Sequence, residues 1–496
     1  MRTAGILMPI TSLPSPYGIG TLGQDARDFI CFLEKAGQTY WQILPIGPLG
    51  YGDSPYSSCS TFAGSPYMID LDDLVAEGLL EESVFKDLTW GASSTRVDYE
   101  LQYKQRFTVL VSSVPKVLDK FSDEYDSFCK EEAYWLNDYA LFMAIKRKYE
   151  GAPWSKWPQE IRVKDAKVLD ILRDSLKDEI IFWKTVQFLF FRQWRKLKDF
   201  AGQHHIKIIG DLPIYVSDDS VDAWSHPEQF QLDENLIPTE VAGCPPDGFS
   251  ADGQLWGNPL FNWDAMKEDG YSWWIARIAH LMKIYDVLRI DHFRGFDSYY
   301  AIPYGDKTAA RGQWKPGPGM DFFDAVKEKL GALPIIAEDL GFLTDSVYDL
   351  LKETGFPGMK VLEFAFDSRD TGRGYKPHQY DHNCVVYAGT HDNETILGWF
   401  DSALPEDADN TIRYFRLNKE EGYNWGLMRN GWASVADTAI MQMQDFLGLG
   451  HEGRMNTPST LGNNWVWRCK KEDISDALAE KIRKEMLLYD RLAETI

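Results

Sequence analysis

VLRIDHF, residues 287–293, has the composition of a short strand that is buried on both faces, but it ends in charged side chains. Seven other short apolar runs are spread along the chain. They are GILMPI from residue 5, WQILPIG from 41, KIIGDLPIYV from 207, PIIAEDLG from 334, MKVLEFAF from 359, NCVVYAGTHD from 383 and TAIMQMQDFLGLG from 438. The last run is equally compatible with a helix.

The segments between these runs have the pattern of amphipathic helices. Residues 22–37 place Phe29 and Leu33 among charged side chains, so one face would be apolar. Similar patterns occur at 272–285, 321–330 and 344–352. Eight strands that alternate with helices predict an α/β fold, a (β/α)8 or TIM barrel.

The spacing of the expected strands is uneven. We expect one catalytic barrel over residues 1–496, with a mostly helical insertion at about 65–200, between strands two and three. A second insertion, at about 217–285 between strands three and four, is rich in Pro, Gly and aromatic residues and is expected to form a loop subdomain at the active site. Too few residues follow the eighth strand for a C-terminal β-sandwich domain, so none is expected.

Composition and charge exclude several classes of protein. The chain is 44% hydrophobic and 26% charged, as in ordinary globular proteins. Its net charge of −23 makes nucleic acid and membrane surfaces poor partners. The six cysteines have no metal-ligand spacing, and no signal peptide or membrane-spanning run is recognisable. We therefore expect a cytoplasmic protein without a bound metal, while the oligomeric state stays open.

Two stretches match the glycine pattern G-x-G-x-x-G, at residues 18–23 and 448–453. A dinucleotide-binding turn follows a strand directly and opens a helix. Pro14 and Pro16 separate the first match from its strand, and Pro458 soon follows the second. We therefore expect no nucleotide cofactor.

Charged residues stand where several expected strands end. They include Asp211, Asp291, Glu338 and Asp392. In a barrel the carboxyl ends of the strands carry the catalytic groups. A buried ion-pair network is the structural alternative, because charge at such places is costly unless it is paired or used. Three separate carboxylate motifs, on strands four, five and seven, favour catalysis.

The spacing suggests which reaction these carboxylates perform. Arg289 and Asp291 are two apart on one strand and should face the same way, so the arginine should keep the carboxylate ionised, as a nucleophile requires. Glu338 ends another strand and could retain a proton as a general acid. This is the working pair of a glycosidase, and a separation of roughly 5–5.5 Å would make the reaction retaining. Asp392 and His391 would contact sugar hydroxyls.

Three segments carry a family resemblance. RIDHFRGF from residue 289, IAEDLG from 336 and AGTHDN from 388 resemble short sequence regions of the α-amylase clan. In combination with LPIGPLGYGDSPYSS from 44, IIGDLPIYVSDDSVDAW from 208, PPDGFSADGQLWGNPLFNW from 245 and RMNTPSTLGNNWVWR from 454, the chain resembles the 4-α-glucanotransferases, also called amylomaltases or disproportionating enzymes. The resemblance runs from residue 5 to about 470.

The resemblance implies a role for each matching residue. Asp291 would be the nucleophile, Glu338 the general acid/base, and Asp392 the carboxylate that stabilises the transition state. The substrate-binding residues would be Tyr56, Asp211, Asp247, Phe249, Gln254, Trp256, Arg289, His292, Asp367, His391 and Asn464. The loop from Cys244 to Trp263 would cover the active site. The substrates would be maltooligosaccharides and α-1,4-glucans, and the family needs no metal or organic cofactor.

Three functions are compatible with these motifs. A retaining 4-α-glucanotransferase would pass a glucan segment from the enzyme to the 4-hydroxyl of another glucan or of glucose. An α-amylase-like hydrolase would use the same first step, with water as the acceptor. A non-catalytic glucan-binding protein is the third, and the intact carboxylate set argues against it. The sequence leaves open the preferred chain lengths and the balance of linear and cyclic products.

Overall fold

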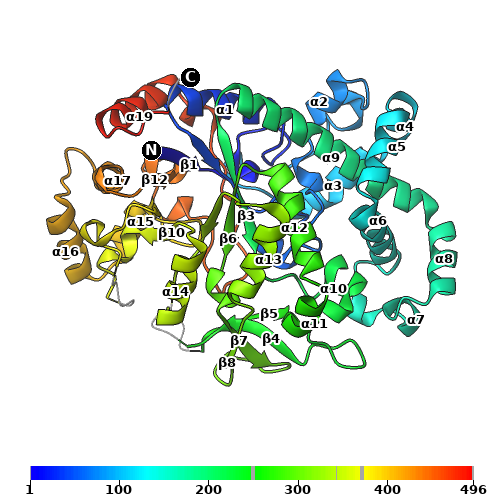
Figure 1. Ribbon diagram of the computed structural model, residues 1–496. Helices are drawn as coiled ribbons and strands as arrows, with labels where there is room; N and C mark the ends of the chain where they lie inside the picture. Colours follow the sequence, from blue (N-terminus) through cyan, green and yellow to red (C-terminus); the bar gives the residue numbers. More distant parts are fainter. Residues whose placement is uncertain (1, 247–251, 342, 369–373, 494–496) are drawn as a thin grey trace.

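A closed barrel of eight parallel strands forms the centre of the computed structural model, which describes residues 2–246, 252–341, 343–368 and 374–493 (Figure 1). Around the barrel the strand order is β1, β2, β3, β6, β9, β10, β11 and β12, and β12 pairs with β1 to close it. Their bounds are β1 Thr3–Leu7, β2 Tyr40–Gln42, β3 Lys207–Pro213, β6 Val287–Asp291, β9 Ile335–Ala337, β10 Gly358–Val361, β11 Cys384–Tyr387 and β12 Thr438–Gln442.

The barrel confirms the fold predicted from the apolar runs, because each run contributes one strand. Burial on both faces explains why the strands are apolar throughout, as in β11, where all four residues are buried. The ambiguous run from residue 438 contains both structures. It forms β12 and then turns at Gln442 into the short helix α18 (Met443–Leu447).

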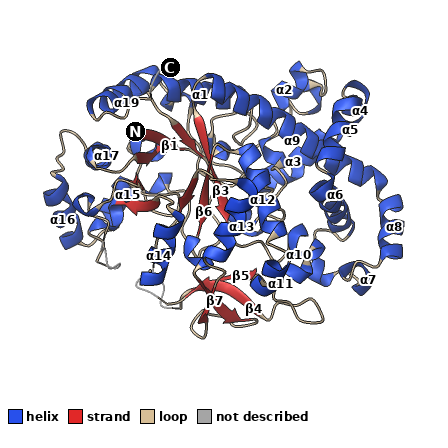
Figure 2. Cartoon of the chain, viewed as in Figure 1, coloured by secondary structure: helices blue, strands red, loops and turns tan. Residues whose placement is uncertain are grey.

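Helices surround the barrel, and the strands lie inside (Figure 2). Those that follow or separate the barrel strands are α1 Gln24–Lys35, α10 Val221–Ser225, α11 Trp263–Glu268, α12 Ser272–Ile284, α13 Met320–Leu330, α14 Asp345–Thr354, α15 Ile396–Ser402, α16 Pro405–Phe415, α17 Tyr423–Ala433 and α19 Asp476–Leu488. In the described chain after β12 the regular elements are helical, apart from an isolated bridge between Arg96 and Trp467.

The segment between β2 and β3 is helical and extends to one side of the barrel, on the right in Figure 1. Its helices are α2 Leu71–Ala76, α3 Tyr99–Val111, α4 Val114–Lys120, α5 Ser122–Glu131, α6 Ala133–Lys148, α7 Gln159–Arg162, α8 Ala166–Ser175 and α9 Lys177–Gln203. Helix α9 packs against α6 and also against the barrel side. Among the described residues, no helix is both long and apolar enough to cross a membrane.

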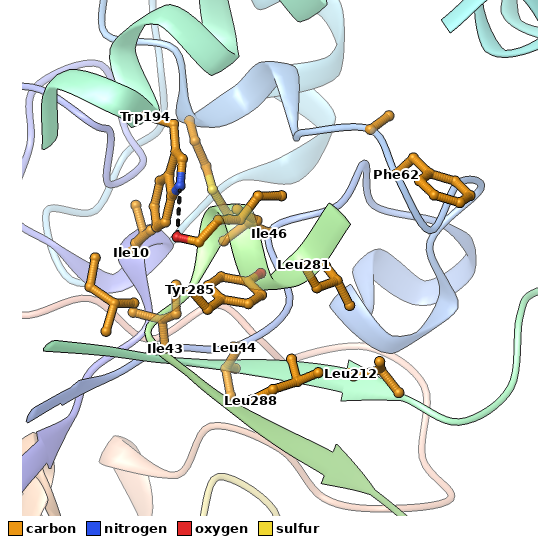
Figure 3. Packing of buried hydrophobic residues seen from close by; sticks show 14 of the residues in the cluster. Ile10, Ile43, Leu44, Ile46, Phe62, Trp194, Leu212, Leu281, Tyr285 and Leu288 are labelled. Atoms are coloured by element: carbon orange, nitrogen blue, oxygen red, sulfur yellow. Dashed lines mark hydrogen bonds between the residues drawn. The ribbon is translucent and has the colours of Figure 1, made fainter. Parts of the chain in front are cut away.

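The contact between α9 and the barrel shapes the strand that carries Asp211. Trp194 of α9 donates a hydrogen bond of 3.3 Å to the carbonyl of Ile284, and its ring lies edge-on against Tyr285 (Figure 3). A Cβ atom at Gly210 would lie 2.1 Å from the Tyr285 ring. Glycine is therefore required at this position for the ring to pack against β3, one residue before Asp211.

A second, antiparallel sheet lies beyond the lower end of the barrel in Figure 1. Its order is β5, β4, β7, β8, with β4 Glu240–Cys244, β5 Gln254–Pro259, β7 Ser298–Pro303 and β8 Gln313–Pro316. A loop subdomain is expected for residues 217–285, and the sequence does not reveal that β4 and β5 form there. The sheet therefore gives regular backbone pairing to both sides of the segment whose residues 247–251 lie outside the described chain.

Candidate active site

The titratable residues singled out in the sequence gather at the carboxyl end of the barrel. Asp211 lies in β3, Arg289 and Asp291 in β6, Glu338 directly after β9, and Asp392 in the turn after β11. Because all eight strands are parallel, their carboxyl ends meet at one rim. Strand register therefore brings together side chains that are far apart in the sequence.

Arg289 bridges two carboxylates. Asp211 and Arg289 are direct register partners on β3 and β6. Arg289 Nη1 lies 2.8 and 2.7 Å from the two oxygens of Asp211, and its Nη2 lies 3.0 Å from Asp291 Oδ1. The Arg289 side chain is 4% exposed and that of Asp211 is 0% exposed, while Asp291 keeps 27% of its side chain accessible. Asp291 is therefore the carboxylate of this group that an incoming molecule can reach.

Two aromatic rings form a wall beside these charges. The Tyr56 hydroxyl, in the 3-10 helix η3 (Pro55–Ser57), donates a hydrogen bond of 2.7 Å to Asp211 Oδ2. Its ring stacks on His391, with centroids 5.1 Å apart, and Trp465 lies against both rings. Tyr56, Asp211 and His391 are expected at one site from the sequence, and the structure brings these three together. Trp465 is not among the residues expected from the sequence, although it forms part of this wall.

Glu338 lies beside Asp291 because β6 and β9 pair, with Ile290 opposite Ala337. Glu338 Oε2 accepts a hydrogen bond of 2.6 Å from the backbone N–H of His292, the residue after Asp291. Glu338 Oε1 accepts a second bond, of 2.9 Å, from the N–H of Leu340. The two backbone donors hold the carboxyl group in one orientation at the rim.

Burial changes the proton affinity of both carboxyl groups. Burial raises the pKa of Glu338 to about 7, although Arg289 and the two backbone donors oppose this shift. Burial also raises the pKa of Asp291 well above its usual range, despite the contact with Arg289. Arg289 favours the ionised form of Asp291, as expected from the sequence, while burial and the neighbouring carboxyl groups oppose it. Neighbouring carboxyl groups that repel each other share protons as a set.

Asp392 is held by a loop from much later in the chain. Asn456 Nδ2 donates a hydrogen bond of 2.7 Å to Asp392 Oδ1, and Arg454 Nη2 donates one of 3.2 Å to the Asp392 carbonyl. His391 Nε2 lies 3.4 Å from Asp392 Oδ2. Asn456 and Arg454 are not among the residues expected from the sequence, although both lie in the RMNTP stretch that carries part of the resemblance.

His292 faces the small sheet. It adopts a left-handed backbone conformation, with φ 53° and ψ 50°, which turns the chain sharply after Asp291. Its ring lies edge-on to Trp256 of β5 at 4.9 Å between centroids, and Trp256 Nε1 donates a hydrogen bond of 3.0 Å to Gln254 Oε1. Trp256 itself is 37% exposed.

The remaining residues expected at the site are placed as follows. Asp367 is buried at 4% exposure, after β10. Asn464 forms hydrogen bonds with Thr457 and Thr460 within the loop that carries Asn456, and these bonds stabilise that loop. Asp247 and Phe249 lie outside the described residues. Within the described ranges, no cluster of His, Cys, Asp or Glu side chains is arranged to hold a metal ion.

The arrangement offers the parts needed for glycosyl transfer. Asp291 is an accessible carboxylate, and the neighbouring Glu338 has a pKa near neutrality and can exchange a proton. Tyr56, Asp211, Arg289 and His391 line one side with hydrogen-bonding groups and ring faces, which suit a sugar.

Comparison with known proteins leads to the same chemistry. A sequence model of the family described as 4-alpha-glucanotransferase, glycoside hydrolase family 77, matches residues 8–474. A 4-alpha-glucanotransferase of Clostridium butyricum is 48% identical, over 98% of this chain and 100% of its own. The enzyme of that name from Thermus thermophilus is 44% identical, over 99% of both chains.

The fold comparison agrees. An amylomaltase from Streptococcus agalactiae, solved in complex with acarbose, superposes with a TM-score of 0.96 at 42% identity. The match covers 99% of this chain and 100% of that one. An amylomaltase from Corynebacterium glutamicum, at 20% identity and a TM-score of 0.75, shares the fold. The chain belongs to the 4-alpha-glucanotransferase family.

Proposed function

We propose that Asp291 and Glu338 are the nucleophile and the general acid/base with which this glucanotransferase moves segments of α-1,4-glucan. One observation carries the assignment. Asp291 projects from β6 with part of its carboxylate accessible, and Glu338 is fixed by the backbone N–H of the very next residue. The two carboxyl groups therefore flank one position at which a glycosidic bond can lie.

The first half of the reaction forms a glycosyl-enzyme. An ionised Asp291 oxygen attacks C1 of the sugar, the bond from C1 to the leaving 4-oxygen breaks, and Glu338 gives its proton to that oxygen. Binding of the donor must leave the shared proton on Glu338, and the contact of 3.0 Å with Arg289 favours the negative charge on Asp291. The piece that carries the reducing end then departs.

The second half regenerates the enzyme. The 4-hydroxyl of an acceptor glucan gives its proton to Glu338 and attacks C1, and the bond from C1 to Asp291 breaks. Two inversions leave the anomeric configuration unchanged. Water in place of the acceptor would give hydrolysis, so the identity of the acceptor distinguishes the two activities.

We assign the surrounding residues to sugar recognition. Tyr56, Asp211, Arg289 and His391 would hold the reacting glucose, and Asp392 would stabilise the positive charge that develops on it. On the acceptor side we place Gln254, Trp256 and His292, because these lie together on the side of the small sheet. Asp247, Phe249, Asp367 and Asn464 stay proposals from the resemblance alone. A single barrel domain that includes both insertions stays a proposal from the spacing of the strands.

Maltooligosaccharides are the proposed substrates. The related Streptococcus agalactiae amylomaltase was solved in complex with acarbose. The rim here combines carboxylates, an arginine and aromatic faces, which supply hydrogen bonds and flat apolar surfaces to sugar rings.

Incubation of the purified protein with maltotriose alone tests the proposed activity. Products are resolved by chain length and reducing ends are counted over time. Transfer gives glucose and a ladder of longer oligosaccharides while the number of reducing ends stays constant. Glucose and maltose with rising reducing ends, and no longer products, would show that water is the acceptor.

The nucleophile has its own test. Asp291→Asn keeps the shape of the side chain and removes the attacking charge, so we expect kcat to fall by at least about 10³-fold. Asp264→Asn, which changes a carboxylate in the first turn of α11, is the matched control. Near-normal turnover of Asp291→Asn would refute the assignment.

A further inference from the structure

A groove of about 410 Å³ lies at the same end of the barrel as the active site, and none of the residues assigned above lines it. It is lined by the start of β7, by β8, by the first turn of α14 and by Arg294, which belongs to the 3-10 helix η8 (Phe293–Phe296). In Figure 1 the small sheet and α14 both lie at the end of the barrel where β6 finishes. Its size falls within the range of small-molecule sites.

One wall of the groove is a flat platform. The guanidinium carbon of Arg294 lies 3.6 Å from the centre of the Trp314 ring, so the two planar groups pack closely. Arg294 is 3% exposed and is further held by a hydrogen bond of 3.0 Å from its Nη2 to Ser298 Oγ. Tyr300 packs edge-on against Trp314 at 5.1 Å. The platform is therefore held in place before any ligand arrives.

A chain of hydroxyl groups around one carboxylate lines the groove beside this platform, and Ser298 contacts both Arg294 and Asp297. Asp297 Oδ2 accepts hydrogen bonds from Ser298 Oγ at 2.9 Å and from Ser346 Oγ at 3.0 Å. Thr344 Oγ1 lies 2.9 Å from Ser346 Oγ. Hydroxyl groups can both donate and accept, so this part of the groove suits a ligand that carries many hydroxyls of its own.

The charges disfavour an anionic ligand. Arg294 is opposed by Asp297 within the same groove, and Lys315 is paired with Glu240. The chain as a whole has a net charge of −23, which repels phosphate groups. A neutral, hydroxyl-rich ligand with flat apolar faces fits this lining better than a phosphate or a carboxylate.

The groove is connected to the reacting groups through short pieces of chain. Arg294 follows Asp291 by three residues, and Thr344 follows Glu338 by six. The groove and the reacting groups lie at the same end of the barrel (Figure 1), so a long polymer that reacts at Asp291 and Glu338 can extend towards it. A short oligosaccharide has less length with which to occupy it.

We propose that the groove between β8 and α14 is an auxiliary subsite that binds a distant part of a long α-1,4-glucan. This inference rests on the proposed function, since it assumes that the glucan reacts at Asp291. The subsite strengthens the binding of long chains without touching the bond that is cut. It thereby makes the enzyme favour polymers over short oligosaccharides.

The ratio of KM for amylose to KM for maltotriose tests this proposal. Trp314→Ala removes the platform, and the ratio should rise about three- to tenfold, as expected for one lost aromatic contact. Because Trp314 also packs against Tyr300, a second variant is needed. Ser346 is exposed in the first turn of α14, so the variant Ser346→Trp should fill the groove with a large side chain. It should also raise the ratio of KM for amylose to KM for maltotriose.

Tyr304→Ala is the matched control, since it removes a 54% exposed aromatic ring just after β7 and outside the groove. The ratio for this variant should equal that of the unaltered protein. Equal changes in KM for both substrates, or no change in either, in the two groove variants would overturn the proposal. Migration in gels that contain amylose measures glucan binding without turnover, so a protein that fails to disproportionate maltotriose would still report on the groove.

Discussion

Arg289 Nη1 contacts both carboxylate oxygens of Asp211, at 2.8 and 2.7 Å, because the two residues are register partners on β3 and β6. The same guanidinium contacts Asp291 through its Nη2. Arg289 is thus held by one carboxylate that is fully covered and touches a second that is accessible. The position of Asp291 depends on a pair of residues buried behind it.

Asp211→Asn should destabilise the protein, because it leaves a buried arginine with one charged partner in place of two. We expect the free energy of unfolding to fall by about 3 kcal/mol, measured by urea denaturation. Asp73→Asn is the control, since it removes a half-buried ion pair with Arg27 and should cost about 1 kcal/mol or less. Equal costs for the two variants would show that burial of the Asp211 pair has no special effect.

The pKa of Glu338 predicts how activity depends on pH. A general acid must carry its proton, so kcat/KM should decline as the pH rises through about 7. A pH series with maltotriose measures this decline.

A donor that needs no proton provides the control. In α-maltosyl fluoride the fluoride leaves without general acid assistance, so formation of the glycosyl-enzyme should lose the alkaline decline. Glu338→Gln should for the same reason be impaired much more with maltotriose than with the fluoride. An equal loss with both donors would contradict the role of Glu338 as the acid.

Asn456 should affect catalysis by positioning Asp392. Loss of its hydrogen bond of 2.7 Å in Asn456→Ala would free the Asp392 carboxylate to turn, and we expect kcat to fall about 10- to 100-fold with little change in KM. Asn463→Gly removes another amide of the same loop, one that binds Arg96, and glycine suits its φ of 61°. A similar loss of kcat in both variants would point to a general disturbance of the loop.

Asp445 should make the free energy of unfolding depend on pH, independently of the pH dependence of activity. Burial raises the pKa of this α18 carboxyl group to about 7. The folded state therefore binds more protons than the unfolded state between about pH 4 and 7, so stability falls as the pH rises through this range.

Asp445→Asn should remove that part of the dependence. The amide oxygen can still accept the bond of 2.8 Å that Ile396 N–H donates to Asp445 Oδ1. Between pH 5 and pH 8, the free energy of unfolding of the variant should rise by about 2–4 kcal/mol relative to that of the unaltered protein. Paired urea titrations at the two pH values measure this change. Asp401→Asn changes an exposed residue of α15 and is the control. Its free energy of unfolding should differ from that of the unaltered protein by the same amount at both pH values. A relative stability of Asp445→Asn that does not change with pH would rule this effect out.

The barrel could be predicted from the sequence because its strands are buried on both faces and therefore leave continuous apolar runs. The small sheet could not, since β4 and β5 are short and partly exposed and lie among Gly, Pro and Asp residues typical of loops. Its pairing of β4 with β7 joins segments on either side of β6, which no local pattern reveals.

The candidate site, too, could be predicted from the sequence only in part. Asp211, Asp291 and Glu338 stand out because a carboxylate at the end of an apolar run is unusual. Asn456 does not stand out, because one amide in a polar loop has no local signal and acquires its role only from a contact with Asp392. The raised pKa of Asp291 was also missed, since the sequence shows its arginine neighbour but gives no measure of how much water folding removes.

The closure of the barrel has a consequence for synthesis on the ribosome. Strand β12 pairs with β1, and Thr438 Oγ1 lies 2.9 Å from Thr3 Oγ1, although most of the chain separates the two residues in sequence. Asp392 in turn receives its brace from Asn456, which emerges later still. A nascent chain can form the helices between β2 and β3 early, since their contacts are local, but its catalytic rim must wait for the final strand. Ribosome-bound intermediates therefore carry an open sheet edge and no complete active site for most of translation.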